Sequence, residues 1–98
     1  MTKQKSQITF IREAVRLLDA KLGRRWPFDI KLRALDMRYE HKCVLGQLFG
    51  DYFTGLWALK LYDENSVKTR TGFDVSISLE LWKTKIRQLR ESRTKHRR

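Results

Sequence analysis

The stretch "CVLGQLFGDYFTGL", residues 43–56, is the most apolar continuous segment of a 98-residue chain in which 34% of the residues are charged. Its apolar side chains recur with a helical period, which predicts a helix over residues 41–53 that ends at Gly55. Gly46 and Gly50 lie four residues apart on the border of its apolar face. A glycine inside a helix costs about 1 kcal/mol relative to alanine. The pair therefore indicates close contact with the first or last helix of the domain, or alternatively a small exposed groove for a partner.

Two longer amphipathic helices are predicted on either side of this segment. Residues 8–22 carry apolar side chains on one face, and Gly23 is placed to end that helix. The last helix is expected to begin at a cap, Ser76 or Ser78, and to continue to about Arg93. Its narrow apolar seam consists of Leu79, Trp82, Ile86 and Leu89.

These patterns predict a small all-α domain, a bundle of three main helices plus short helical turns, whose basic C-terminal helix extends past the core. Residues 30–37 are expected to cover the core as a connection, because no second segment with convincing strand alternation lies nearby. The layout is a basic N-terminal arm at residues 1–7, a helical domain at 8–90 and a basic C-terminal tail at 91–98. The apolar seam is expected to hold the fold without the tail.

The net charge of +11, from 22 Lys and Arg against 11 Asp and Glu, favours polyanionic partners. Nucleic acid comes first, an acidic protein surface second and an anionic membrane third. The single cysteine, Cys43, excludes an internal disulfide and indicates a reducing compartment, so a cytoplasmic location is expected. The polar N-terminus has no signal-peptide pattern, and no apolar run approaches the ~20 residues that span a bilayer.

Asp36, His41 and Cys43 are the candidates for nucleophilic chemistry. On a helix, residues two apart point about 200° away from each other, so His41 and Cys43 cannot readily pair. A helix N-terminus lowers the pKa of a cysteine, but a buried structural role suits Cys43 better. Two histidines and one cysteine give no metal-ligand spacing. The sequence therefore predicts a non-enzymatic protein without a metal or a cofactor.

The basic C-terminus is the feature that predicts nucleic-acid binding. The seam stops after Leu89, and Arg93 takes the next inward position, so the helix is expected to project into solvent. Cations on such a helix can neutralise phosphates. A second patch is expected if the first helix packs beside the last, and it consists of Arg12, Arg16, Arg24 and Arg25. The predicted nucleic-acid-binding residues are Lys83, Arg87, Arg90, Arg93, Lys95, Arg97, Arg98, Arg12 and Arg16.

Tryptophans are candidates for stacking on bases. Trp82 belongs to the apolar seam, so a core position is expected for it. For Trp26 and Trp57 the sequence leaves both a core position and a stacking role open.

The segments "ITFIREAVRLLDAKLGRRWPFDIKLRALDM" (residues 8–37) and "CVLGQLFGDYFTGL" (residues 43–56) resemble a family of small proteins found in phages and prophages. The shared features are a helix with a Leu-Leu-Asp pattern, a Leu-Asp-Met turn and the core that begins Cys-Val-Leu-Gly. The resemblance covers roughly residues 9–75 and leaves out the basic tail. It implies a phage accessory protein, a class that often binds host factors or nucleic acid, and it carries over no functional residues.

The leading prediction is a phage-type accessory protein that binds nucleic acid through its basic C-terminal helix and tail. The alternative is an inhibitor of a host enzyme or defence complex, comparable to an anti-CRISPR protein. It would use the same basic face on an acidic or nucleic-acid-loaded host protein. Either partner would place the protein in the host cytoplasm, away from membranes.

Overall fold

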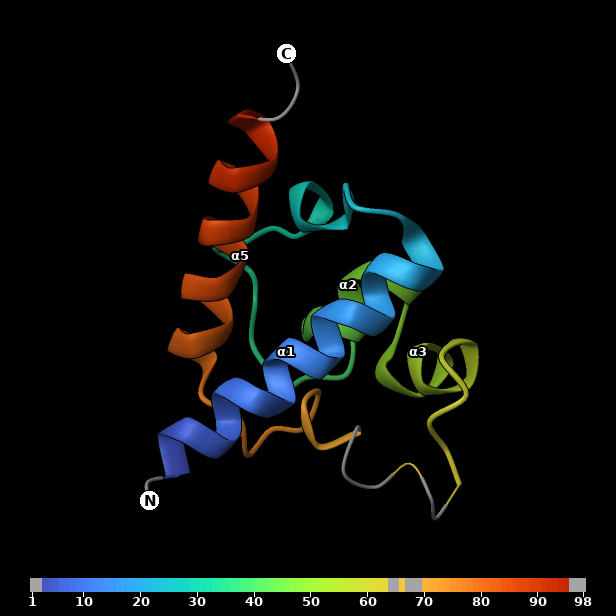
Figure 1. The fold of residues 1–98 in the computed structure, drawn as a ribbon. Coiled ribbons are helices and arrows are strands. Elements are labelled where there is room, and N and C mark those ends of the chain that lie inside the picture. The colour runs from blue at the N-terminus through green and yellow to red at the C-terminus, as the bar shows by residue number, and fades with distance from the viewer. Residues whose placement is uncertain (1–2, 64–65, 67–69, 96–98) are drawn as a thin grey trace.

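The computed structural model of the chain describes residues 3–63, 66 and 70–95. Its elements in chain order are helix α1 (Lys3–Leu22), the 3-10 turn η1 (Trp26–Asp29), helices α2 (Val44–Phe49) and α3 (Tyr52–Ala58), and helix α5 (Leu79–Lys95) (Figure 1). Within the described residues the backbone forms no strand, which confirms the predicted all-α fold class. Among these helices, none combines the length and the apolar character needed to cross a membrane.

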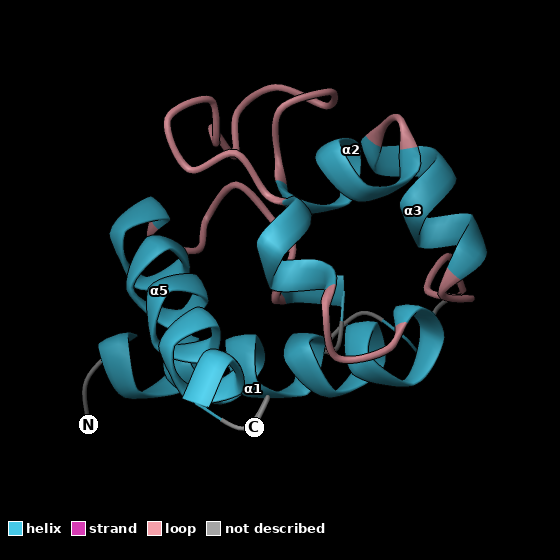
Figure 2. Cartoon of the chain, turned by 90° about the horizontal axis from the view of Figure 1, so that it is seen from above, coloured by secondary structure: helices cyan, strands magenta, loops and turns pink. Residues whose placement is uncertain are grey.

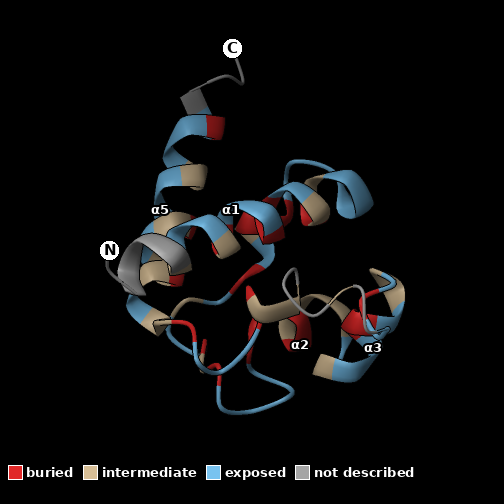
Figure 3. Cartoon of the chain, turned by 60° about the horizontal axis from the view of Figure 1, so that its bottom comes forward, coloured by how far each residue is buried: buried red, intermediate tan, exposed pale blue. Residues whose placement is uncertain are grey.

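The hydrophobic core draws side chains from every element of the fold (Figure 3). In α5 the predicted seam is confirmed, since Trp82 and Ile86 are fully buried. This helix begins after Ser78, whose hydroxyl accepts a hydrogen bond from the backbone N–H of Leu81 at 3.4 Å, so the second of the two expected caps is the one used. The core residues outside α5 are Ile11, Ala14, Val15, Leu18, Trp26, Ile30, Leu35, Met37, Cys43, Val44, Leu45, Leu56, Leu61, Phe73 and Ile77.

Helix α1 ends where the sequence predicts and begins earlier. Gly23 closes the helix with a φ of +87° and donates its N–H to the carbonyl of Asp19 at 2.9 Å. The predicted start at residue 8 is wrong, because α1 begins at Lys3, within the stretch expected as an arm at residues 1–7. Gln7 connects this part of α1 to the start of α5, because its side-chain oxygen accepts a hydrogen bond at 3.0 Å from the backbone N–H of Ser78.

The single helix predicted over residues 41–53 is wrong, because the chain breaks at Gly50. This glycine has a φ of +106° and ends α2 by donating its N–H to the carbonyl of Gly46 at 2.9 Å. Asp51 then caps α3 by accepting a hydrogen bond from the N–H of Thr54 at 2.7 Å. A glycine stop followed directly by an aspartate cap overrides the continuous apolar period.

The two remaining glycines of this region sit at close contacts. A Cβ on Gly46 would lie 2.2 Å from the carbonyl oxygen of Glu40 and 2.6 Å from the carbonyl carbon of His41. The segment that approaches is therefore the turn before α2, and not the first or last helix. Gly55 lies inside α3 instead of ending a helix, and a Cβ there would meet the Leu45 side chain at 2.7 Å. Gly46 and Gly55 are buried, and the close contacts at both positions indicate a packing role. Gly46 also borders an open cavity of about 330 Å³, which Lys31, His41 and Gln47 line as well.

The end of α5 is tied to the body of the protein. Arg93 is 8% exposed, and its guanidinium donates to both carboxylate oxygens of Asp19 at 2.9 Å each. It also donates to the carbonyl of Arg24 at 2.7 Å. The same carboxylate accepts a hydrogen bond from the indole N–H of Trp26 at 2.8 Å. The inward position predicted for Arg93 is confirmed, whereas the expectation that the helix projects into solvent after Leu89 is wrong at this residue. Helix α5 continues to Lys95, into the stretch predicted as a tail at residues 91–98.

The helices place two different regions at opposite ends of the molecule. Helix α5 lies at one end beside α1, and α3 lies at the other (Figures 1 and 2). Residues 30–43 connect the two regions without regular structure, and Ile30, Leu35 and Met37 from this connection are buried. The predicted core-covering connection is therefore confirmed.

Candidate nucleic-acid interface

Positive charge is concentrated on the two long helices. Helix α1 contains five basic and two acidic residues, and helix α5 contains six basic and two acidic residues. The two helices therefore hold a surplus of seven out of the net charge of +11 of the whole chain. A basic surplus on neighbouring helices is the electrostatic footprint expected of a nucleic-acid-binding surface.

Arg12 and Arg16 lie on the flank of α1 that faces α5. On that flank, Ile8 lines a groove between the two helices and Asp19 reaches across to the end of α5. Residues four apart lie on the same side of a helix, so Arg12 follows Ile8 and Arg16 follows Arg12 along this flank. Both arginines are exposed, and neither forms an ion pair within the described part of the chain.

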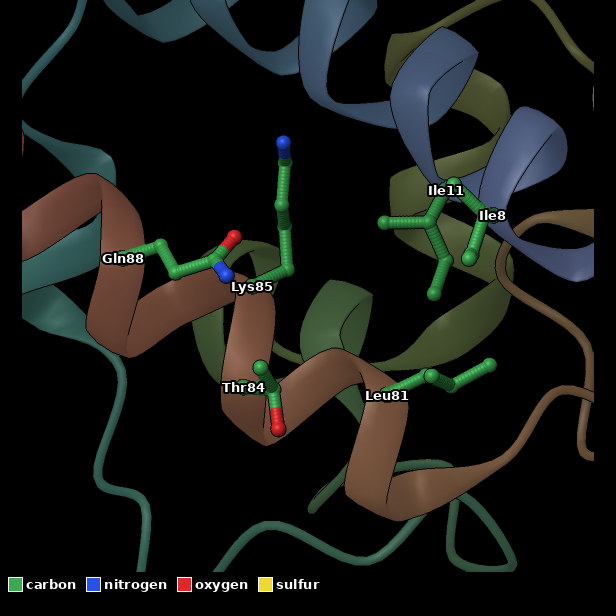
Figure 4. Close-up of a pocket in the computed structure, with 6 residues that line it drawn as sticks. All are labelled: Ile8, Ile11, Leu81, Thr84, Lys85 and Gln88. Carbon is green, nitrogen blue, oxygen red and sulfur yellow. The ribbon is translucent and has the colours of Figure 1, made fainter.

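The α1–α5 groove is an open apolar cavity of about 150 Å³. Figure 4 shows Leu81 of α5 pointing toward Ile8 and Ile11 of α1, with Lys85 standing beside them. Sequence reasoning left Lys85 out of the predicted site. Its position four residues after Leu81, on the flank of the apolar seam, is the sequence feature that could have identified it. The lining residues are Ile8, Ile11, Leu81, Thr84, Lys85 and Gln88.

The opposite flank of α5 carries a second set of cations. Residues 83 and 85 are two apart on a helix, so Lys83 points about 200° away from Lys85 and from the groove. Lys83 is half-buried and Arg87 is exposed. Arg90 lies on the same flank and donates hydrogen bonds to the carbonyl of Pro27 at 2.8 Å and to the carbonyl of Ile30. The structure therefore does not bring the predicted residues together into one patch.

The C-terminal part of the predicted site divides in two. The guanidiniums of Arg90 and Arg93 bind protein atoms, so both side chains contribute to the fold. The side chain of Lys95 and all of Arg97 and Arg98 lie outside the described residues. The exposed basic residues of the predicted set that the structure does place are Arg12, Arg16 and Arg87.

A second candidate surface is aromatic and lies on and after α3. Trp57 is 70% exposed and stacks on Tyr62, with 4.9 Å between ring centroids. Phe53, one helical turn before Trp57, is 65% exposed. We call these three side chains the aromatic surface. The sequence left Trp57 open between core and surface, whereas Trp26 is 1% exposed and belongs to the core.

The three candidates for nucleophilic chemistry have separate partners. Asp36 binds the guanidinium of Arg38, which holds the pKa of this carboxyl down at about 2. The imidazole of His41 makes a 2.8 Å hydrogen bond with the carbonyl of Gly50. Cys43 is 2% exposed, and burial raises the pKa of its thiol despite its place at the start of α2. No nucleophile–base pair connects these side chains in the described structure.

Metal ligands do not gather in the described part of the chain, where no three His, Cys, Asp or Glu residues are close enough to hold an ion.

Comparison with known proteins assigns no family, since no family model, no curated protein and no solved structure matches this chain. Two surfaces of the protein bear on its function. One is the aromatic surface, and the other is the basic side of α1 and α5, which we define by Arg12, Arg16 and Lys85.

Proposed function

We propose that this protein is a non-enzymatic accessory protein of the phage type that binds nucleic acid in the host cytoplasm through the basic side of α1 and α5. The observation that carries the proposal is the charge surplus of seven on these two helices. Arg12 and Arg16 are exposed on the flank of α1 beside the groove, and Lys85 stands at the groove itself. Arg87 is exposed on the opposite flank of α5. The resemblance to small phage proteins supports the same role.

Binding of this kind is mainly electrostatic. Each phosphate contact on duplex DNA contributes about −0.9 to the slope of log affinity against log salt concentration. The contact set differs from a free basic tail, because Arg90 and Arg93 are occupied by protein groups. We therefore expect α1 to contribute as much as α5.

The test compares two double variants with equal loss of charge. Arg12→Gln with Arg16→Gln removes two exposed cations beside the groove. Lys42→Gln with Lys60→Gln removes two exposed cations elsewhere and serves as the control. Affinity for a 20-base-pair DNA duplex is measured by fluorescence anisotropy from 50 to 200 mM salt. The first variant is expected to reduce the magnitude of the salt slope by about 1.8, while the control leaves it nearly unchanged.

Equal effects of the two double variants would assign binding to net charge alone and contradict a surface on α1 and α5. Absence of binding to either DNA or RNA at 50 mM salt would reject the proposed function. Thermal melting of each variant checks that the fold is retained.

The aromatic surface supports a second proposal, binding of a host protein. This proposal uses a different face from the basic face that the sequence suggested. Helices α2 and α3 contain no charged residue, so their surface offers little attraction to a polyanion. Aromatic enrichment and depletion of charge are typical of the centre of a protein–protein interface. A cavity of about 200 Å³ beside Phe53 adds a recess for a partner side chain, with Met37 and Val75 as apolar lining and Arg38, Glu40 and Asp74 as charged lining.

The second function is tested by capture from host lysate treated with nuclease. A protein partner is identified by mass spectrometry, and the purified partner is then titrated against the Trp57→Ala variant and the Arg12→Gln, Arg16→Gln variant. Loss of affinity with Trp57→Ala alone supports the aromatic surface as the interface. Loss with the arginine variant alone contradicts it and favours the basic side.

A further inference from the structure

The α1–α5 groove lies within the basic side of the protein, but its lining is mainly apolar. Its lining includes Ile8, Ile11 and Leu81 as apolar groups, Lys85 as a cation and no acidic residue. Apolar side chains contribute nothing to phosphate binding, so a surface that held only the backbone of a duplex would have no use for this recess. The groove calls for a ligand that combines an apolar ring with nearby negative charge.

We propose that the α1–α5 groove accepts one unpaired base of a single-stranded nucleic acid, while Lys85 and Arg12 bind the adjoining phosphates. This inference rests on the proposed nucleic-acid-binding function and specifies the form of nucleic acid that is bound.

The size of the groove suits one ring system. Its volume is about 150 Å³, and an apolar protein cavity of about this volume holds a benzene molecule. In a duplex each base is stacked and paired, whereas in a single strand it can be turned out toward a protein pocket at low cost. The groove is therefore open to a single strand and closed to an intact double helix.

The charges around the groove match a strand that runs across it. Lys85 stands on the α5 side, as Figure 4 shows, and Arg12 follows Ile8 by one helical turn on the α1 side. A base between Ile8 and Leu81 would therefore have a cation on each side of it. Gln88 adds an amide, which offers both a donor and an acceptor to the polar edge of a base.

The carboxylates of the two helices do not oppose this arrangement. Asp19 is engaged with Arg93 and with the indole of Trp26. Glu13 of α1 is exposed and lies about 140° around the helix from Ile8. In α5, Glu80 and Glu91 are about 100° or more around the helix from Lys85, on the solvent side. The local field at the groove is thus positive, as an anionic strand requires.

The experiment measures binding of 12-nucleotide single strands and the matching duplexes, in DNA and RNA, by fluorescence anisotropy at 50 mM salt. Single strands are expected to bind at least fivefold more tightly than the duplexes. Ile8→Ala should weaken single-strand binding about fivefold without changing the salt slope, because it removes an apolar wall and no cation. Lys85→Gln should reduce the magnitude of the slope by about 0.7, the value for one phosphate of a single strand.

Leu22→Ala is the matched control, because Leu22 is also an exposed aliphatic residue of α1, at 40% against 43% for Ile8. It lies at the far end of the helix and should leave binding unchanged. As a second readout, NMR should show single-strand-dependent shifts of the methyl signals of Ile8, Ile11 and Leu81. This readout needs no variant and is independent of any effect of substitution on folding.

The outcomes separate this inference from the proposed function. Equal binding of single strands and duplexes, with Ile8→Ala neutral, overturns the groove as a base site and leaves nucleic-acid binding standing. Absence of binding to every oligonucleotide overturns both. If decanoate shifts these methyl signals and oligonucleotides do not, the groove binds an anionic amphiphile and the inference is overturned.

Discussion

Helices α1 and α5 differ from helices α2 and α3 in both charge and packing. The two long helices hold fifteen charged residues, whereas α2 and α3 hold none. The long helices are joined near their C-terminal ends by an ion pair, Asp19 with Arg93, and the short helices by an apolar contact of Gly55 with Leu45. In the charge-rich long helices, a few specific polar contacts add to the packing of the core. The charge-free short helices depend on close packing alone.

The first prediction tests the close packing of the short helices. Gly46→Ala places a Cβ 2.2 Å from the carbonyl oxygen of Glu40, so the backbone of one segment has to move. We expect a loss of about 3 kcal/mol in the free energy of unfolding, measured by urea denaturation followed by circular dichroism. Gly50→Ala is the control for backbone strain alone, because no atom lies within 4 Å of its Cβ position. A smaller effect at Gly46 than at Gly50 would contradict the packing account.

The second prediction tests the ion pair of the long helices. Arg93→Leu leaves the carboxylate of Asp19 without its main partner in a site where the arginine side chain is 7% exposed and the aspartate 22%. Breaking a buried pair costs about 3–5 kcal/mol, and the partial exposure of Asp19 reduces this to about 2 kcal/mol. Deletion of residues 91–98 should be at least as damaging. Arg87→Leu is the control, because Arg87 is an exposed arginine of the same helix with no ion pair in the described residues, and it should leave the melting temperature nearly unchanged.

The third prediction sharpens the difference between two tryptophans. Trp57 is 70% exposed and contacts Tyr62, so Trp57→Ala should cost less than about 1 kcal/mol of stability. Trp26→Ala should cost about 3 kcal/mol or more, because Trp26 is buried and donates to Asp19. Thermal melts of the two variants give the comparison. Equal losses would mean that the aromatic surface is part of the core.

The smallest effect is expected in the connection between the two regions. Arg38 holds the pKa of Asp36 at about 2, below the ordinary value of 3.8. A lowered pKa in the folded state contributes stability above about pH 3.8, and this contribution is lost as the pH falls toward 2. The wild type should therefore be slightly more stable than Asp36→Asn at pH 6, and most of the difference should be lost by pH 2, where about half of the Asp36 carboxyl groups are protonated. Urea midpoints at the two pH values measure it, and a pH-independent difference would exclude this ion pair as its cause.

Much of the fold was readable from local patterns in the sequence. The seam around Trp82 and Ile86, the stop at Gly23 and the cap at Ser78 all depend on residues within one or two helical turns. The break at Gly50 was also encoded locally, by a glycine stop followed by an aspartate cap. It was missed because the apolar period continues through it.

The candidate site was less predictable, because side-chain environments depend on distant partners. Arg12, Arg16 and Arg87 are exposed as a basic surface requires, but Arg90 and Arg93 are bound to protein groups. Helical period places Arg93 at an inward position, but nothing near Arg90 or Arg93 in the sequence identifies the groups that they bind. The sequence separation between partners is sixty residues or more in both cases.

The sequence by itself determined the all-α class, the net positive charge and the burial of Cys43, because composition and helical period require no knowledge of long-range contacts. Only the tertiary structure decided which cations are free, which tryptophan faces solvent and where a groove opens. The occupied cations and the groove depend on how α1 and α5 lie against each other, whereas the exposure of Trp57 depends on the position of α3. The exposure and pairing of a charged side chain depend on the surrounding fold, whereas helical period is a property of the local chain.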